Sequence, residues 1–196
     1  MLASLGALAM GVAYLFLPDQ LTVGPSWLEL AIAAVVLAPL LYTVYFRPLP
    51  HHVGRAIRTV LQVALTVALL SSLALLVTHL PTLHGGGQLL RAATLLWLSN
   101  VLIFSVWYWE IDGDGPVARH KRGHPAADFQ FPQQAAGRPF APGFVDYLFL
   151  AFCFATALSP ADTSPLTARA KLLMMAEAVI SMLILVLLVA RSVNII

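Results

Sequence analysis

The chain has 196 residues, of which 60% are hydrophobic and only 10% are charged. Soluble domains carry about 25% charged residues, and a soluble core of this size could not bury so much apolar surface, so an ordinary soluble domain is excluded. A formal net charge of +2, spread over the polar segments, gives no nucleic-acid-binding face, and lipid is the expected surrounding for most side chains.

Four long apolar runs precede the main polar stretch, and each predicts a membrane helix. The first run ends at Pro18-Asp19 and lacks the basic residues that open a signal peptide, so it predicts a short first helix. The fourth run ends in Trp107-Tyr108-Trp109, an aromatic cluster typical of a membrane–water boundary. A proline-containing polar link, Arg47–Arg55, separates the second run from the third. The four predicted helices cover residues 2–17, 27–46, 58–80 and 89–111.

The stretch from Glu110 to Gly143 is polar, is punctuated by glycine and proline, and predicts an ordered or semi-ordered loop. Phe144–Leu158 is apolar again, but a helix of this length would extend roughly 22 Å against a hydrocarbon core of about 30 Å. It is therefore either a short span or a re-entrant helix. A proline-containing turn at 159–167 then leads to a final long helix, Ala168–Ile196.

These elements predict an all-α, polytopic transmembrane bundle of about six apolar helices, with the fifth helix short or re-entrant. The pattern divides into an N-terminal four-helix membrane region at 1–112, a polar loop at 113–143 and a C-terminal pore-like helical hairpin at 144–196. Six spans would place most Lys and Arg residues on one side, and the positive-inside rule then puts both termini in the cytoplasm. A re-entrant fifth helix would leave five spans, with the termini on opposite sides. The expected location is a cell membrane, as a multi-pass protein of a bacterial inner membrane.

From the fifth apolar run onward, the order of elements resembles the pore module of potassium channels. Phe144–Phe152 stands where the aromatic-rich pore helix lies, Asp162 falls near the filter aspartate, and Ala168–Ile196 stands for the inner helix. The filter position reads Ala157-Leu158-Ser159-Pro160-Ala161, without the glycines whose positive φ lets a ring of carbonyls face the ion. Ser181 occupies the position of a hinge glycine. The sequence therefore predicts a channel-like hairpin without a selective potassium filter.

The chain is also similar to uncharacterised bacterial polytopic membrane proteins. The similar segments are Asp146-Tyr-Leu148, Ala155-Thr-Ala157, Ser159-Pro-Ala-Asp-Thr163 and the start of the last helix. Membership of that group would imply the membrane fold and would leave the activity open.

Glu177 stands out because it lies inside the last apolar run. A structural charge group with Arg169 and Lys171, near the membrane surface, is the favoured interpretation. The functional alternative is a role in ion or proton movement, because a carboxylate within a span is costly and usually faces a partner or water. The pore or ion-pathway candidates are Thr156, Ser159, Asp162, Thr163, Glu177 and Ser181.

The segment before the last helix combines turn formers with a helix-capping pattern. Thr167 is placed to cap the final helix, and Asp162 could accept hydrogen bonds from free amides in the turn. A tight connector is the favoured interpretation, and a vestibule for a cation or a small polar ligand is the alternative.

Further polar residues receive structural interpretations. Ser99 and Asn100 lie mid-way along the fourth predicted helix and are expected to form hydrogen bonds between helices. Asp146, the one charge in the fifth apolar run, is expected to make a structural polar contact. The alternating acidic residues Glu110, Asp112 and Asp114 resemble a calcium loop but lack the bidentate glutamate that closes one, which favours a solvated turn.

The pairs His51/His52 and His120/His124 could form a zinc site, but no Cys pair or His-Glu-x-x-His motif accompanies them. Contact with lipid phosphate is the favoured interpretation. The lone Cys153 excludes an intramolecular disulfide and is expected to pack as a small core residue. The sequence has no nucleophile elbow, P-loop or dinucleotide fingerprint, so we expect no catalytic residue, metal or cofactor.

Three functions from different classes fit this sequence. The first is a channel-like or transport-related membrane protein, an oligomer whose last two apolar elements form the shared centre. The second is a non-catalytic subunit or assembly partner of a membrane complex. The third is a membrane enzyme that acts on lipid through His and Asp residues of its loops. The expected partners are the lipid bilayer and either identical subunits or a larger membrane complex, and not nucleic acid.

Overall fold

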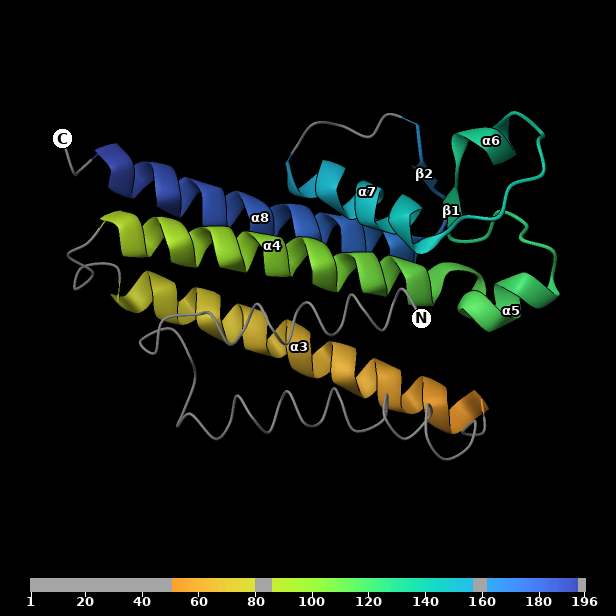
Figure 1. The fold of residues 1–196 in the computed structure, drawn as a ribbon, viewed down its shortest axis with the longest axis horizontal. Coiled ribbons are helices and arrows are strands. Elements are labelled where there is room, and N and C mark those ends of the chain that lie inside the picture. The colour runs from red at the N-terminus through yellow and green to blue at the C-terminus, as the bar shows by residue number, and fades with distance from the viewer. Residues whose placement is uncertain (1–50, 80–85, 157–161, 194–196) are drawn as a thin grey trace. The chain divides into compact units, whose positions relative to one another are not determined.

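Figure 1 shows as ribbons the residues that the computed structural model describes, which are 51–79, 86–156 and 162–193. The two helices predicted at 2–17 and 27–46 lie outside the described residues, and so does the filter-like segment 157–161. The elements in chain order are α3 (His51–His79), α4 (Gly86–Ile111), the 3-10 turn η2 (Asp112–Asp114), α5 (Pro116–Lys121), β1 (Phe129–Gln130), α6 (Pro132–Ala135), α7 (Phe144–Ala155), β2 (Ser164–Pro165) and α8 (Ala168–Val193). The strands have only two residues each, so the described part of the chain belongs to the all-α class.

Three described helices are long and apolar enough to cross a membrane. These candidate spans cover Gly54–Thr78 in α3, Leu89–Asp114 in α4 and η2, and Ala168–Val189 in α8. The fifth predicted helix is α7, which has 12 residues. It measures about 18 Å and is too short to cross a hydrocarbon core of about 30 Å. These lengths fit a membrane protein, whereas the predicted total of six apolar helices includes segments that the structure does not describe.

The ends of two helices follow from local chemistry. α8 begins directly after Thr167, whose Oγ1 accepts a hydrogen bond from the Ala170 amide at 3.3 Å. This is the predicted N-cap, in which a threonine oxygen satisfies an amide that the first helical turn leaves free. α3 begins at His51, earlier than predicted, so part of the expected polar link is helical. Pro50 immediately precedes this start in the sequence.

One stripe of α3 is buried, and the rest of its surface is largely apolar and exposed. Leu69, Leu73 and Leu76 are buried at the spacing of one helix face. The hydroxyls of Thr66 and Ser71 donate to carbonyls one turn earlier, each at 2.8 Å, so these polar groups are satisfied within the helix. The exposed apolar side chains include Val60, Val63, Val67 and Leu70. Such a surface fits contact with lipid.

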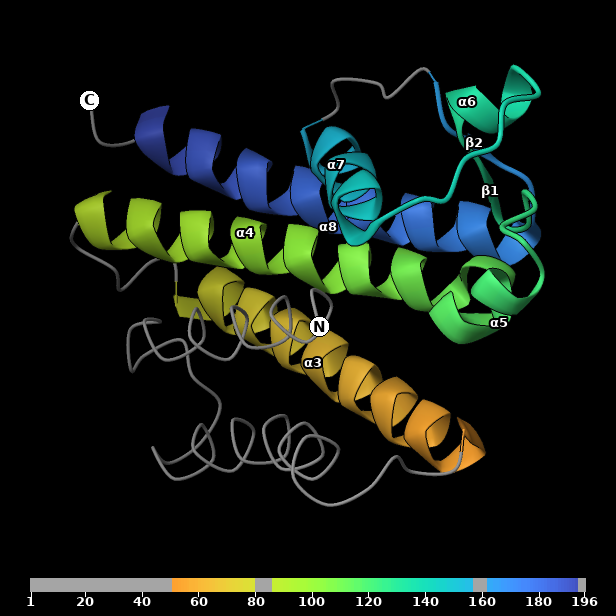
Figure 2. The ribbon, with the colours of Figure 1, turned by 45° about the vertical axis from the view of Figure 1, so that its right-hand side comes forward.

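The described residues fall into two compact units, one of which comprises residues 100–183. The other contains α3 together with residues 86–99 of α4 and 184–193 of α8. Within the unit 100–183, α7 lies beside α8, as Figure 1 and Figure 2 both show. Ser181 of α8 donates a hydrogen bond to the carbonyl of Ala155 at the end of α7, which ties these two helices together.

The predicted polar loop contains short elements and a small core of its own. β1 and β2 pair in antiparallel register, with Phe129 opposite Pro165 and Gln130 opposite Ser164. Phe129 and Phe131 are buried, although their neighbours in the sequence are mostly polar. The loop is therefore ordered in this region and packs onto the start of α8.

Candidate functional site

Glu177 lies inside the candidate span of α8 and is completely buried, with 0% of its surface exposed. Tyr108 of α4, which is also buried, donates its hydroxyl hydrogen to Glu177 Oε2. The other carboxyl oxygen, Oε1, is buried and has no hydrogen-bond partner among the described residues. The side-chain amide of Asn100 donates to the backbone carbonyl of Glu177 at 3.3 Å. α4 therefore contacts this residue of α8 at two points.

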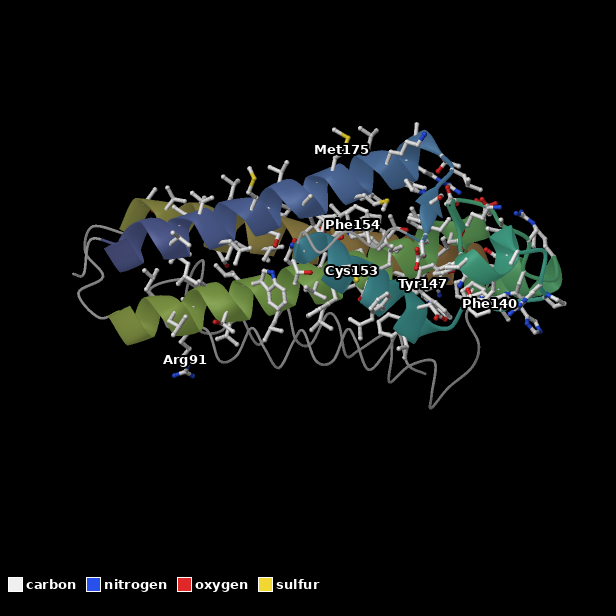
Figure 3. All side chains as sticks on the ribbon, turned by 90° about the horizontal axis from the view of Figure 1, so that it is seen from above. Arg91, Phe140, Tyr147, Cys153, Phe154 and Met175 are labelled. Carbon is white, nitrogen blue, oxygen red and sulfur yellow. The ribbon has the colours of Figure 1, made fainter. Side chains whose placement is uncertain are left out.

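The sequence of α8 turns Glu177 toward the protein. Ala170, Met174, Glu177 and Ile180 are buried at intervals of three or four residues, so they form one buried stripe of the helix. The opposite face of α8 is apolar and exposed, and in Figure 3 Met175 points away from α7. The exposed residues of this face include Leu172, Met175, Val179 and Met182. The carboxyl group thus faces protein groups and is directed away from the exposed apolar face of the helix.

Two further polar side chains are buried near Glu177. Asn100, on α4, is completely buried, and its Oδ1 has no hydrogen-bond partner among the described residues. Ser181 lies one turn after Glu177 and is also buried, with its hydroxyl bonded to α7. We call Asn100, Tyr108 and Glu177 the carboxyl site. It combines one carboxyl group, one phenol and one amide between two candidate spans.

A second buried polar cluster lies where α4 ends. Asp112 Oδ1 accepts hydrogen bonds from the backbone amides of Asp128 at 2.9 Å and Phe129 at 3.2 Å. Its Oδ2 accepts the hydroxyl hydrogen of Tyr147 at 2.5 Å. Asp112 is therefore buried, and the predicted solvated turn is wrong at this residue. The prediction fails because the donors lie far along the sequence, in the loop and in α7.

Arg119, from α5, is buried beside this carboxylate, with only 2% of its surface exposed. Its Nη1 donates to the backbone carbonyls of Asp112 at 2.6 Å and Trp109 at 3.1 Å, and lies 3.9 Å from the Asp112 carboxylate. The guanidinium carbon lies 4.7 Å from the ring centre of Trp109 and 5.1 Å from that of Tyr147. The carboxylate and the two ring faces compensate the buried positive charge.

Arg169, at the start of α8, binds Asp128 through two charged hydrogen bonds, from Nε to Oδ1 at 2.5 Å and from Nη2 to Oδ2 at 2.6 Å. The Thr167 hydroxyl also donates to Oδ1 at 2.6 Å, and the Gly113 amide donates to Oδ2 at 3.1 Å. Gly113 has φ +57°, which glycine adopts without strain. Burial opposes ionisation of Asp128, but these hydrogen bonds outweigh it and lower the pKa of the carboxyl group.

We call the second cluster the interfacial network and define it by Asp112, Arg119, Asp128, Tyr147 and Arg169. It joins α4, α5, the loop, α7 and α8. Arg169 Nη2 also donates to the backbone carbonyl of Ile111 at 3.1 Å. The network therefore fixes the end of α4 against the start of α8, on the two helices that carry Tyr108 and Glu177.

The free energy of unfolding should depend on pH through Asp128. The folded-state pKa of this residue lies below the ordinary value of 3.8. Its stabilisation is therefore complete above the ordinary pKa and is lost as the pH falls through the folded-state pKa. We expect acid to destabilise the protein below about pH 4, and we expect Arg169→Gln to reduce this pH dependence. Detergent-solubilised protein unfolded at a series of pH values measures both effects, and identical pH profiles for the two proteins would contradict them.

Phe129 connects the two clusters through ring contacts. Its ring centre lies 5.2 Å from that of Tyr108 and 6.3 Å from that of Tyr147. Each tyrosine donates its hydroxyl hydrogen to a buried carboxyl group, Tyr108 to Glu177 and Tyr147 to Asp112. A buried phenylalanine from the loop thus contacts both tyrosine–carboxyl pairs.

The other predicted pathway residues have different surroundings. Thr156 directly follows α7, and its hydroxyl donates to the carbonyls of Phe152 at 2.9 Å and Cys153 at 3.1 Å. Asp162 is exposed and Thr163 is half-buried, just before β2. Ser159 lies outside the described residues. Of the six pathway candidates, the structure therefore places Glu177 and Ser181 as buried neighbours on α8.

The structure also describes three residues that the sequence predicts to have structural roles. Asp146 Oδ2 accepts a hydrogen bond from the Gly143 amide at 2.7 Å and so caps the start of α7. Ser99 is buried in α4. Cys153 is buried in α7 with a free thiol.

His120 and His124, at the end of α5 and just beyond it, contact each other through Nδ1 and Nε2 at 3.3 Å. Burial and then the charges of His120 and Arg119 lower the pKa of His124. In the part of the chain that the structure describes, no group of three or more His, Cys, Asp or Glu side chains could hold a metal ion. The side chains of His51 and His52 are not among those described.

No protein-family model, no curated protein and no solved structure matches this chain. Its function is therefore inferred from the chemistry of its buried polar groups. Within residues 100–183, this chemistry is concentrated in the carboxyl site and the interfacial network.

Sequence patterns indicate Glu177 and Asn100 as candidates but miss their partner Tyr108. The aromatic cluster around Tyr108 is typical of a membrane surface, yet the structure buries this side chain against Glu177. One usable signal is that Tyr108 follows Asn100 by roughly two helical turns. Arg119 and Asp128 lie in a region without a regular apolar period, so no pattern predicts their burial.

Proposed function

We propose that this chain is an integral membrane protein of a channel-like or transport-related kind, in which Glu177 binds and releases a positively charged species within the bilayer. The observation that carries this proposal is the complete burial of Glu177 in a candidate span, with Oε1 lacking a partner among the described residues. A carboxylate in a medium of low dielectric constant needs a compensating positive charge. A proton or a cation can supply that charge.

The ion pairs of the neighbouring basic residue support this proposal over a purely structural charge group. Arg169 directs its guanidinium to Asp128 and approaches Asp114, at 3.8 Å. Lys171 is exposed. Among the described residues, Glu177 has no salt bridge, and its carboxyl group receives only the neutral hydroxyl of Tyr108. The negative charge of an ionised Glu177 therefore needs a positively charged species that can bind and dissociate.

The proposed setting is a bundle of six apolar helices in a bacterial inner membrane, where the chain forms an oligomer or joins a larger complex. The three candidate spans support the membrane setting. A selective potassium filter is not part of the proposal, because the sequence at 157–161 lacks the glycines that such a filter needs.

The test is ion flux through liposomes that contain the purified protein. We expect the wild-type protein to dissipate an imposed gradient and Glu177→Gln to lose at least 90% of that flux, roughly a tenfold effect of the kind expected when an obligatory carboxyl is removed. Glu110→Gln, the same substitution on a half-buried residue at the end of α4, is the matched control and should keep the flux. Equal flux in wild type and Glu177→Gln, or no flux above empty liposomes, would refute the proposed role.

A second function, a non-catalytic subunit of a membrane complex, is favoured by one feature of α7. Val145, Phe149 and Phe152 are exposed on this helix, which is too short to cross the bilayer. A partner protein could cover these side chains. This alternative predicts a stoichiometric partner after purification in mild detergent, and a solitary, flux-competent protein would exclude it.

A further inference from the structure

The carboxyl site indicates which positively charged species Glu177 takes. We propose that it is a proton, held on Glu177 Oε1, rather than a metal cation. This inference rests on the proposed function, because it names the species that the same site binds.

The described oxygen atoms around Glu177 are too few for a metal cation. The side-chain oxygens of the carboxyl site are the two carboxyl oxygens, the Tyr108 hydroxyl and Asn100 Oδ1. Ca²⁺ and Mg²⁺ need about six or more oxygen ligands. An alkali ion in a channel needs a ring of carbonyls that replaces its water. Here Glu177 and Tyr108 lie within α8 and α4, whose interior carbonyls are engaged in helical hydrogen bonds.

The backbone carbonyl of Glu177 itself is also engaged in a hydrogen bond. The Glu177 carbonyl accepts the hydrogen bond from the side-chain amide of Asn100. The hydroxyl of Ser181, one turn along α8, donates to the Ala155 carbonyl on α7. Both groups are therefore engaged in hydrogen bonds of their own. A proton, in contrast, needs only a single oxygen atom.

The two carboxyl oxygens differ in a way that suits a proton. Oε2 accepts the Tyr108 hydroxyl hydrogen, whereas Oε1 has no partner among the described residues. On protonation, an O–H bond forms at Oε1, Oε2 keeps the hydrogen bond from Tyr108, and the pair becomes neutral. On release, the O–H bond breaks, its electron pair stays on the carboxylate and the proton passes to water. Tyr108 then acts as a positioning residue, because it holds Oε2 in both states.

Infrared difference spectroscopy of protein in lipid membranes tests this proposal without measuring transport. We subtract the infrared spectrum of Glu177→Gln from that of the wild-type protein. We expect the difference spectrum to show the carbonyl stretch of a neutral carboxylic acid, and this band should disappear as the pH is raised. The Glu177 band should persist in the Glu110→Gln protein, which leaves Glu177 in place. Adding Na⁺, K⁺, Ca²⁺ or Mg²⁺ at constant pH should leave the band unchanged. Replacement of the band by a carboxylate band on adding one of these ions would overturn the proposal, as would its absence at every pH.

Tyr108→Phe separates positioning from a merely structural contribution. Loss of the hydroxyl removes the hydrogen bond to Oε2, so the band should shift in frequency without disappearing, and Tyr108→Trp should disturb folding instead. An unshifted band in a folded Tyr108→Phe protein would refute the positioning role. If the band titrates with pH but liposomes show no flux, the proton site stands and the transport function fails. If flux occurs but metal ions displace the band, the proton assignment fails and the transport function stands.

Discussion

Replacing Arg119 with alanine is expected to lower the free energy of unfolding by about 3–5 kcal/mol, the range measured when one member of a buried ion pair is removed. The side chain is buried beside Asp112 and covers the faces of Trp109 and Tyr147. Its loss removes the positive charge that lies 3.9 Å from the buried Asp112 carboxylate and opens space under two aromatic rings. Denaturant unfolding in detergent, followed by circular dichroism, measures the change.

Arg122→Ala is the matched control for this prediction. Arg122 lies in the same segment and pairs with Asp114 at 3.1 Å, but its side chain is 55% exposed. Exposed ion pairs contribute about 0–1 kcal/mol, because water and salt screen them. If Arg119→Ala lowered the free energy of unfolding as little as Arg122→Ala does, the interfacial network would not stabilise the protein. A double variant, Arg119→Met with Asp112→Asn, should recover part of the loss because it removes both buried charges.

Phe129→Ala is expected to cost about 3–5 kcal/mol, as other large-to-small substitutions of buried phenylalanine do. The Phe129 ring is completely buried and contacts the rings of both Tyr108 and Tyr147. Its removal would leave a cavity between the two tyrosine–carboxyl pairs. Thermal unfolding in detergent reports the loss of stability, and the infrared band of Glu177 reports any effect on the carboxyl site.

Phe149→Ala serves as the comparison, because it removes the same side chain from an exposed position on α7, where 64% of the residue is exposed. Its effect should stay within about 0.5 kcal/mol, the range typical of surface substitutions. Should Phe129→Ala prove as mild as Phe149→Ala, the loop would not pack onto the helices as described. If Phe129→Ala is destabilised but the infrared band of Glu177 is unchanged, the Phe129 ring contributes to stability and does not affect the carboxyl site.

The helices were predictable because lipid imposes a simple pattern. A span needs a long run of apolar residues, so the runs ending at Ile111 and starting at Ala168 mark the corresponding helix ends correctly. The Thr167 cap was predictable as well, because an N-cap depends on residues only three positions apart. The start of α3 was not, because the polar residues after Pro50 look like a link although they continue the helix.

Sequence patterns could not identify the hydrogen-bond partners of the buried carboxyl groups. The sequence marks Glu177 because a carboxyl group in an apolar run is costly wherever its partner lies. It does not show that Tyr108 is that partner, since the two residues are 69 positions apart. Asp112 is a similar case, because its burial depends on amides of the loop and on Tyr147 of α7.

The interfacial network links stability to the proposed function. It holds the end of α4 at Ile111 against the start of α8 at Arg169. Tyr108 lies about one turn before that contact on α4, and Glu177 lies about two turns after it on α8. Loosening the network is therefore expected to disturb the hydrogen bond between Tyr108 and Glu177.

The proposed proton site requires that the exposed face of α8 lies in lipid. Measurements of collisions between spin labels on this face and dissolved reagents test this requirement most directly. Nitroxides attached at Met175→Cys and Val179→Cys, in a Cys153→Ala background, would report the surroundings of two exposed residues on this helix. We expect frequent collisions with oxygen, which dissolves in hydrocarbon, and few with a water-soluble nickel chelate. Frequent collisions with the chelate at both positions would place this face of α8 in water and contradict a membrane-embedded carboxyl site.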